Sequence, residues 1–154
     1  LMLTSLLMFI GGGSAGTAGG VKVGTVMLLM LIVWSEIRGK SDVEAFGRRI
    51  GEHTQRRAIS IVFLSAIVVM GLGYALVALS PHIAPKKAVF EAVSAFATVG
   101  LSTGVTAQFT DPGKYLLIFL MFVGRVGPIT LFAALASRRK PVYYQFPKED
   151  VIVG

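Results

Sequence analysis

The chain alternates between long apolar stretches and shorter charged ones. Apolar residues dominate 1–35, 58–80 and 115–137, whereas charged residues gather in 36–57 and after position 137. The stretch 58–80 carries no charge, ends before Pro81, and has the ~20-residue length that an α-helix needs to cross a bilayer. The pattern therefore predicts an all-α integral membrane protein with spanning helices at 58–80 and 114–137.

The first apolar stretch is too long for one straight span. A helix over 1–35 would measure roughly 52 Å, whereas the hydrocarbon core is about 30 Å thick. Glycine costs about 1 kcal/mol relative to alanine in a helix, so we expect a break at a run of small residues: Gly11, Gly12, Gly13, Ser14, Ala15, Gly16, Thr17, Ala18, Gly19 and Gly20. Irregular backbone at membrane depth needs protein or water beside it, which predicts an adjoining cavity or pore.

The glycine run has three other interpretations. A flexible linker is one, although strongly apolar segments flank it. A helix-packing face is another, since glycine recurs every fourth position from Gly12 to Gly24. Residues 11–16 also fit the dinucleotide fingerprint G-x-G-x-x-G, with Glu36 at the expected spacing. That fingerprint requires alternating strands and helices, and the later apolar runs are too long for buried strands.

The stretch 88–106, AVFEAVSAFATVGLSTGVT, suits a short helix at 88–97 followed by an extended loop at 98–106. The helix would be about 15 Å long, with Glu91 in its first turns, where a negative charge complements the helix dipole. A half-length helix before Thr98-Val99-Gly100, between two spans, is the layout of a potassium-channel pore loop, whose carbonyls replace the ion's water shell. A simple re-entrant loop or helix-capping turn is the alternative.

Arg125 is the one charge inside the last span, and its position is near the bilayer centre. An arginine there costs at least about 2.5–3.5 kcal/mol. We therefore expect it to face the bundle interior and to pair with carbonyls freed by the break at 11–20. A structural arginine that only locks two helices is the alternative. Residues that favour a helix kink flank it: Gly124, Gly127 and Pro128.

Composition agrees with a membrane protein and excludes several other classes. The chain is 54% hydrophobic and 15% charged, against about 25% charged residues in soluble domains. It has no cysteine, and His53 and His82 are far apart, so no metal cluster or catalytic constellation is expected and the chain is not predicted to be an enzyme. The net charge of +7 does not predict nucleic-acid binding, because basic residues border the apolar spans.

The distribution of basic residues predicts the orientation. Segment 36–57 has six and the tail from Arg138 has four, whereas the opposite side has only Lys86, Lys87 and Lys114. By the positive-inside rule, the 36–57 connection and the 138–154 tail are cytoplasmic and the pore loop faces outward. Because the chain starts without methionine inside an apolar run, we expect it to be a fragment of a longer polypeptide.

Three motifs together resemble the Trk/Ktr/HKT superfamily of potassium transporters, and most closely the membrane subunit of bacterial Ktr systems. They are FEAVSAFATVGLSTGVT at 90–106, MFIGGGSAGTAGGVK at 8–22 and GRVGPIT at 124–130. The resemblance implies a pore built from four M1–pore–M2 repeats in one chain. Segment 1–35 would then be the broken M2 helix of the third repeat, followed by the cytoplasmic connection. Segment 58–137 would be the fourth repeat, with M1 at 58–80, the pore helix at 88–97, the filter loop at 98–106 and M2 at 114–137.

The resemblance also implies a function and roles for individual residues. The carbonyls of Thr98, Val99, Gly100 and Leu101 would bind K⁺, Gly100 being the filter glycine, during potassium uptake across the cell membrane. The run 11–20 would be the gating loop, contacted by Arg125. Implied partners are membrane lipid, a second copy of the subunit and a cytosolic ring of nucleotide-binding regulatory subunits, with Na⁺ coupling open. A membrane module without an ion path is the rival, and it requires the carbonyls of 98–102 to be bonded internally.

Overall fold

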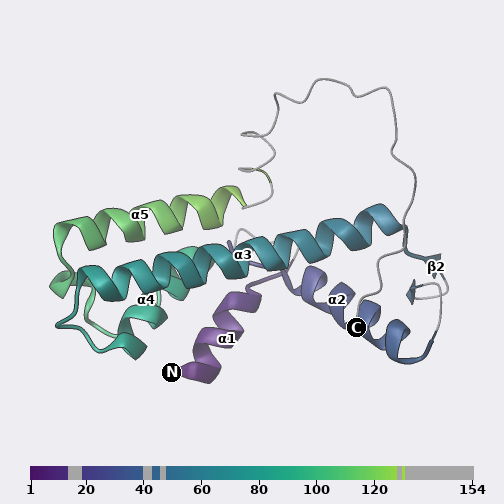
Figure 1. Ribbon diagram of the computed structural model, residues 1–154, viewed down its shortest axis with the longest axis horizontal. Coiled ribbons are helices and arrows are strands. Elements are labelled where there is room, and N and C mark those ends of the chain that lie inside the picture. The colour runs from purple at the N-terminus through teal and green to yellow at the C-terminus, as the bar shows by residue number, and fades with distance from the viewer. Residues whose placement is uncertain (14–18, 40–42, 46–47, 128–129, 131–154) are drawn as a thin grey trace, which may run out of the picture.

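The computed structural model describes residues 1–13, 19–39, 43–45, 48–127 and 130, and these residues are almost entirely helical (Figure 1). The helices are α1 (Met2–Ile10), α2 (Val23–Ile37), α3 (Glu52–Leu79), α4 (Pro85–Ala97), the 3-10 turn η1 (Thr106–Gln108) and α5 (Asp111–Val126). Two short strands, β1 (Glu44–Ala45) and β2 (Arg48–Arg49), pair antiparallel between α2 and α3.

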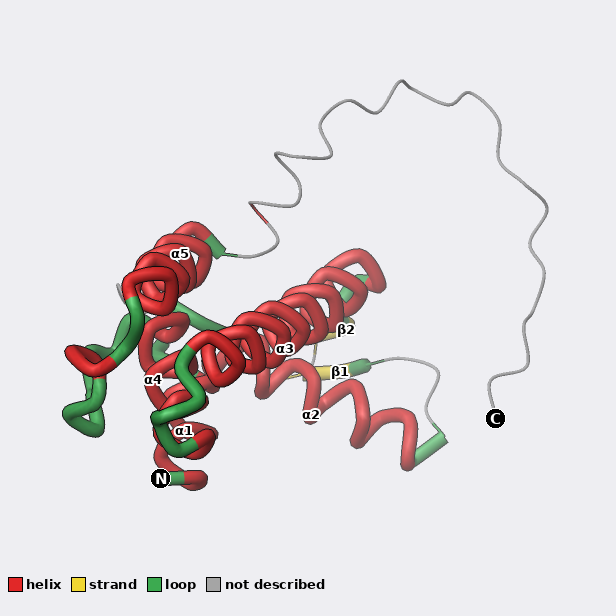
Figure 2. The backbone as a smooth tube through the Cα atoms, turned by 60° about the vertical axis from the view of Figure 1, so that its left-hand side comes forward, coloured by secondary structure: helices red, strands yellow, loops and turns green. Residues whose placement is uncertain are grey.

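Helix α4 lies at the centre of the arrangement. It contacts α1, α3 and α5, while α2 packs against α3. Figure 2 shows α4 between α1 and α5, and Figure 1 shows α3 running along the length of the molecule. The hydrophobic core is accordingly built on α4, with Phe96 fully buried and its ring stacked on Phe9 at a centroid distance of 6.3 Å.

The sequence of α4 explains why it begins, ends and packs where it does. Pro85 occupies the first turn, where a missing N–H costs nothing, so the helix starts three residues before the predicted position. Every residue from Phe90 to Ala97 is buried, with at most 6% of its surface exposed. Several are alanines, which allow neighbouring helices to approach closely. The helix ends at Thr98, which adopts a left-handed conformation.

Helix α3 is longer than the apolar stretch that predicted it. It begins at Glu52 instead of Ala58, because the charged turn before the apolar run is also helical and carries an exposed Glu52–Arg56 pair at 3.7 Å. Among the described helices, α3 is the one that is long and apolar enough to cross a membrane by itself. Hydropathy marks the part of a helix that suits lipid, whereas helix ends depend on backbone bonding.

Helix α5 begins at Asp111, three residues before the predicted start of the last span at 114, and Asp111, Pro112 and Gly113 form its first turn. The Thr110 hydroxyl caps the helix by accepting a hydrogen bond from the Gly113 amide at 3.4 Å. At the other end, Gly127 (φ 87°) terminates the helix after Val126, as expected for a glycine before a proline. The rest of the predicted span, apart from residue 130, lies outside the described residues.

The structure also removes the context for a dinucleotide site. The G-x-G-x-x-G fingerprint has to follow a strand and open a helix. Here helix α1 precedes Gly11, and the only strands in the described part of the chain are β1 and β2. Residues 11–16 therefore do not belong to a nucleotide-binding βαβ unit.

Helices α4 and α5 approach so closely that one position admits glycine alone. A Cβ atom at Gly124 would lie 1.8 Å from the Phe96 carbonyl oxygen. The two glycines of α3 are in ordinary surroundings: a Cβ at Gly73 would lie 3.7 Å from that of Ala92, and one at Gly71 would meet nothing within 4 Å. The tight backbone contact is therefore on α5.

The substitution Gly124→Ala is expected to lower the free energy of unfolding by about 1–3 kcal/mol or more, because backbone atoms have to move apart. Gly73→Ala is the matched control and should be neutral or stabilising by up to ~1 kcal/mol, through helix propensity. Thermal unfolding of the complete protein in detergent measures both. Equal unfolding midpoints for the two variants would contradict the close approach of α4 and α5.

Candidate functional site

The candidate filter begins where α4 ends. Thr98 has φ 53° and ψ 36°, a left-handed conformation that is rare for a β-branched residue. The Thr98 amide donates to the Ala95 carbonyl at 3.1 Å, and the Val99 amide donates to the Ser94 carbonyl at 3.2 Å. The first two amides of the loop therefore donate hydrogen bonds to carbonyls at the end of α4, and these bonds fix the direction in which the loop leaves the helix.

The carbonyl oxygens of the loop differ in their bonding. That of Leu101 accepts a hydrogen bond from the Ser94 hydroxyl at 2.5 Å, which leaves one lone pair. Those of Thr98, Val99 and Gly100 accept no hydrogen bond from any described residue. Val99, Gly100 and Leu101 are exposed. A packed structural module would need internal partners for all these oxygens, and within the described residues only Leu101 has one.

The segments on either side of the glycine-rich break are hydrogen-bonded to each other. The Val21 amide donates to the Phe9 carbonyl at 3.3 Å, and the Val23 amide donates to the Gly12 carbonyl at 3.1 Å. Gly11 has φ 70°, and a Cβ there would lie 2.7 Å from the Val21 carbonyl oxygen. Residues 14–18, including the predicted gate residues Ser14, Ala15, Gly16, Thr17 and Ala18, lie outside the described residues. What the structure describes is a loop whose ends are held together.

The end of this loop meets both the candidate filter and α5. The Gly19 amide donates to the Thr98 hydroxyl at 2.9 Å, and the Gly20 amide donates to the Gly124 carbonyl at 3.3 Å. A Cβ at Gly19 would lie 2.9 Å from the Thr98 hydroxyl oxygen and 3.0 Å from the Gly124 carbonyl oxygen. The structure therefore brings three motifs that are distant in sequence into direct contact.

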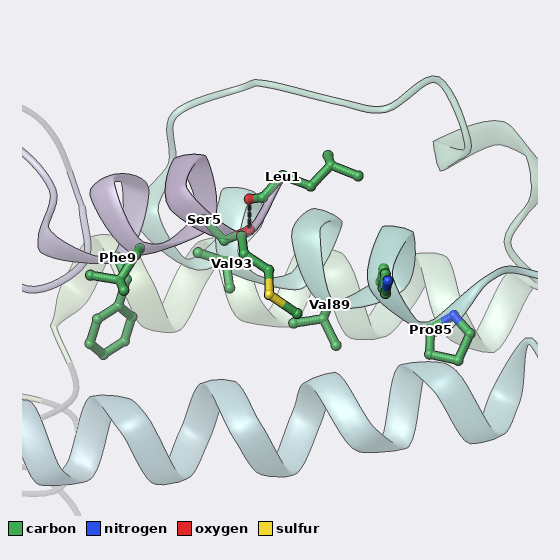
Figure 3. Close-up of a pocket in the computed structure, with 9 residues that line it drawn as sticks. Leu1, Ser5, Phe9, Pro85, Val89 and Val93 are labelled. Carbon is green, nitrogen blue, oxygen red and sulfur yellow. Dashed lines mark hydrogen bonds between the residues drawn. The ribbon is translucent and has the colours of Figure 1, made fainter.

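Two cavities lie near α4, and only one touches the candidate site. A cavity of about 310 Å³ is lined by the filter loop, by Glu91 and Ser94 of α4, and by Leu117 and Met121 of α5. A larger one, of about 470 Å³, lies between α1 and α4 and has an apolar lining (Figure 3). None of the predicted site residues lines the larger cavity, so its size does not indicate the site.

Comparison with known protein families decides what kind of protein this geometry belongs to. The family model described as TrkH, cation transport protein, matches residues 1–140. The chain belongs to the TrkH cation transport family. This is a family of transporters and not of enzymes.

Individual relatives of this TrkH-family chain carry transport names. The chain is 36% identical to Ktr system potassium uptake protein B of Vibrio alginolyticus. It is 38% identical to potassium/sodium uptake protein NtpJ of Enterococcus hirae, and 35% identical to Ktr system potassium uptake protein B of Bacillus subtilis. Each match includes 100% of this chain but only 33%, 35% and 34% of the respective relative. The chain therefore spans about a third of the length of these relatives.

For this TrkH-family chain, the expectation that Arg125 faces the bundle interior stays a prediction. Arg125 lies in the last turn of α5 and is exposed within the described structure. The described contact between α5 and the glycine run is made by the backbone of its neighbour Gly124. The predicted contact of Arg125 with the gating loop also involves residues 14–18, which lie outside the described residues.

Glu91 is a site residue that sequence reasoning missed. The charge was expected to complement the start of the pore helix, but α4 begins at Pro85, so Glu91 lies more than one turn inside it. Its carboxylate instead accepts hydrogen bonds from Ser102, Thr103 and Thr106 of the loop. An acidic residue inside an otherwise apolar stretch of a membrane protein is a functional-site hypothesis by default, and that signal would have pointed to Glu91.

The Gly19–Thr98 hydrogen bond can be tested with an isosteric variant. Thr98→Val removes the acceptor, so amide exchange at Gly19 should accelerate by about twofold to tenfold, as expected for one hydrogen bond. Thr98→Ser keeps the hydroxyl and should keep the protection. Hydrogen exchange of peptides that contain Gly19, in the complete protein, measures this. Unchanged exchange in Thr98→Val would show that the two motifs are not bonded.

Proposed function

We propose that this chain forms part of a pore-forming subunit that mediates potassium uptake across the cell membrane. The observation that carries the proposal is the set of carbonyls at Thr98, Val99 and Gly100, which no described residue bonds. They follow directly on the C-terminal end of α4, where the helix dipole is negative and favours a cation. Leu101 would contribute its second lone pair. Relatives named as potassium uptake proteins support K⁺ as the ion.

Gating would depend on the glycine-rich loop. Its last amides are bonded to Thr98 and to the Gly124 carbonyl, so a movement of the loop has to break contacts with both the filter and α5. We propose that the loop at 11–20 obstructs or clears the ion path below the filter. Arg125, next to Gly124, would favour one position of this loop over the other.

The proposal includes partners for the complete protein and its orientation in the membrane. In the complete protein, one copy would pair with a second copy in the lipid bilayer, with the filter loop outside and the 138–154 tail in the cytoplasm. The segment 36–57, whose described part includes the strands β1 and β2, would dock a cytosolic ring of nucleotide-binding regulatory subunits. One relative is named as a potassium/sodium uptake protein. Transport assays of this chain's complete protein should therefore follow Na⁺ as well as K⁺.

The filter assignment predicts that Gly100→Ser lowers the preference for K⁺ over Na⁺. Gly100 has φ 81°, and a Cβ there would meet nothing within 4 Å, so the cost is backbone strain of about 1 kcal/mol or more, and the strain displaces the carbonyls. Gly39→Ser is the matched control, since Gly39 has φ 63° and equally open space but follows Arg38, the C-cap residue of α2. Uptake of K⁺ and Na⁺ by the complete protein in a bacterial strain that lacks potassium uptake measures the preference. Equal selectivity in both variants would remove the filter assignment.

The gate assignment predicts that deleting residues 13–19 raises the conductance. The flanking segments are already bonded to each other, through Val21 with Phe9 and Val23 with Gly12, so a shortened connection can form. Ion flux into vesicles that contain the complete protein measures the effect. A deletion variant that is inserted and folded but closed would indicate that the run is structural.

A further inference from the structure

We propose that Glu91 is a positioning residue of the filter, one that holds the loop beyond Gly100 against α4 through hydrogen bonds and not through its charge. The inference rests on the proposed function, because it assigns a role in the same site. Glu91 is 5% exposed and lies on the helix that precedes the filter. Its hydrogen-bond partners are Ser102, Thr103 and Thr106 and not the proposed ion ligands, so the effect proposed here passes through the loop.

The Glu91 carboxylate collects four hydrogen bonds from the outer half of the loop. One oxygen accepts from the Ser102 hydroxyl at 2.8 Å, and from the amide and hydroxyl of Thr103 at 2.6 and 3.0 Å. The other oxygen accepts from the Thr106 hydroxyl at 2.9 Å. All four donors lie on residues 102–106, so the Glu91 side chain holds this part of the loop against α4.

Ser94 lies one turn further along α4 and holds the Leu101 carbonyl at 2.5 Å. Side chains three residues apart lie on the same face of a helix, so Glu91 and Ser94 together present one bonding surface to residues 101–106. The other end of the loop is fixed by the amides of Thr98 and Val99. The unbonded carbonyls are therefore held between two anchored ends, one of which depends on Glu91.

The hydrogen-bond partners of Glu91 are neutral groups of the loop and not a basic side chain. Among the described residues no basic side chain pairs with it; the ion pairs there are Glu52–Arg56 and Asp111–Lys114. Glu91 does line the cavity that also touches Gly100, so a direct electrostatic effect on the ion is the competing explanation. The two explanations differ in whether an uncharged residue of the same shape can replace Glu91.

Counting hydrogens shows that glutamine can. Ser102 and Thr106 are also within 2.9 Å of each other, so their two hydroxyl hydrogens face three oxygen–oxygen contacts when the carboxylate only accepts. In Glu91→Gln, the amide oxygen keeps the bonds from Ser102 and Thr103, and the amide nitrogen donates to Thr106. Thr106 is then free to donate to Ser102, so each of these three contacts has one hydrogen.

The test compares Glu91→Gln with Glu91→Leu in the complete protein reconstituted in vesicles, by K⁺ and Na⁺ uptake and by hydrogen exchange at Thr103. We expect Glu91→Gln to keep the wild-type selectivity and protection. We expect Glu91→Leu to lose about tenfold or more in K⁺ over Na⁺ preference, as the loss of bonds to a carboxylate implies, and to expose the Thr103 amide. If Glu91→Leu does not fold, the double variant Thr103→Val and Thr106→Val replaces it and should lose selectivity.

Two results would overturn the proposal. Loss of selectivity in Glu91→Gln, with Thr103 still protected, would assign the effect to the charge. Retained selectivity in Glu91→Leu or in the double variant would show that the bonds do not position the filter. Failure of the proposed function is distinguishable, since the wild-type protein would then transport no K⁺, whereas the exchange comparison would still decide whether Glu91 holds the loop.

Discussion

The hydrogen-bonding needs of irregular backbone within a membrane are the constraint on which this structure depends. A helix satisfies its own amides and carbonyls, whereas a loop at membrane depth has to find partners in the protein or in a water-filled path. In the described part of the chain, this constraint would apply to two irregular segments, the break after α1 and the segment after α4. The Thr98 hydroxyl and the Gly124 carbonyl serve the first loop, and Glu91 and Ser94 serve the second. The carbonyls of Thr98, Val99 and Gly100 accept no hydrogen bond from a described residue, and in the proposed function these three face the ion.

The two loops are held as one unit because α4 and α5 approach each other closely. The contact of Gly124 with the Phe96 carbonyl leaves no room for a side chain, and the Gly124 carbonyl accepts from Gly20 at the same point. The end of the glycine run therefore lies against the end of α4. In the proposed function, a movement of the loop would change the Gly19–Thr98 hydrogen bond, at the point where the candidate filter begins. A local rearrangement of a few hydrogen bonds would be enough to couple them.

Much of this arrangement could be predicted from the sequence, since length and hydropathy carry strong signals in membrane proteins. The half-length helix before Thr98 and the position of the long apolar helix follow from composition and spacing. Helix ends were less accurate, because a polar turn can extend a helix: α3 begins at Glu52 and not at Ala58, and α5 begins at Asp111 and not at 114.

The partners of individual groups could not be predicted, because they depend on which segments meet in space. Nothing local indicates that Gly19 bonds to Thr98, which lies 79 positions away. The bonding of Glu91 to residues 102–106 is closer in sequence, but it depends on the loop folding back along α4. Gly124 was seen as a site of kinking, whereas its importance is the close approach to Phe96.

The measurement that tests the central claim most directly is the location of a heavy potassium substitute in the complete protein. Rb⁺ can be identified by anomalous scattering in crystals grown with it in place of K⁺. The account predicts Rb⁺ density on the pore axis, in contact with the carbonyl oxygens of Thr98, Val99 and Gly100. Density elsewhere with those oxygens bonded to amides, or turned away from a pore axis, would contradict it.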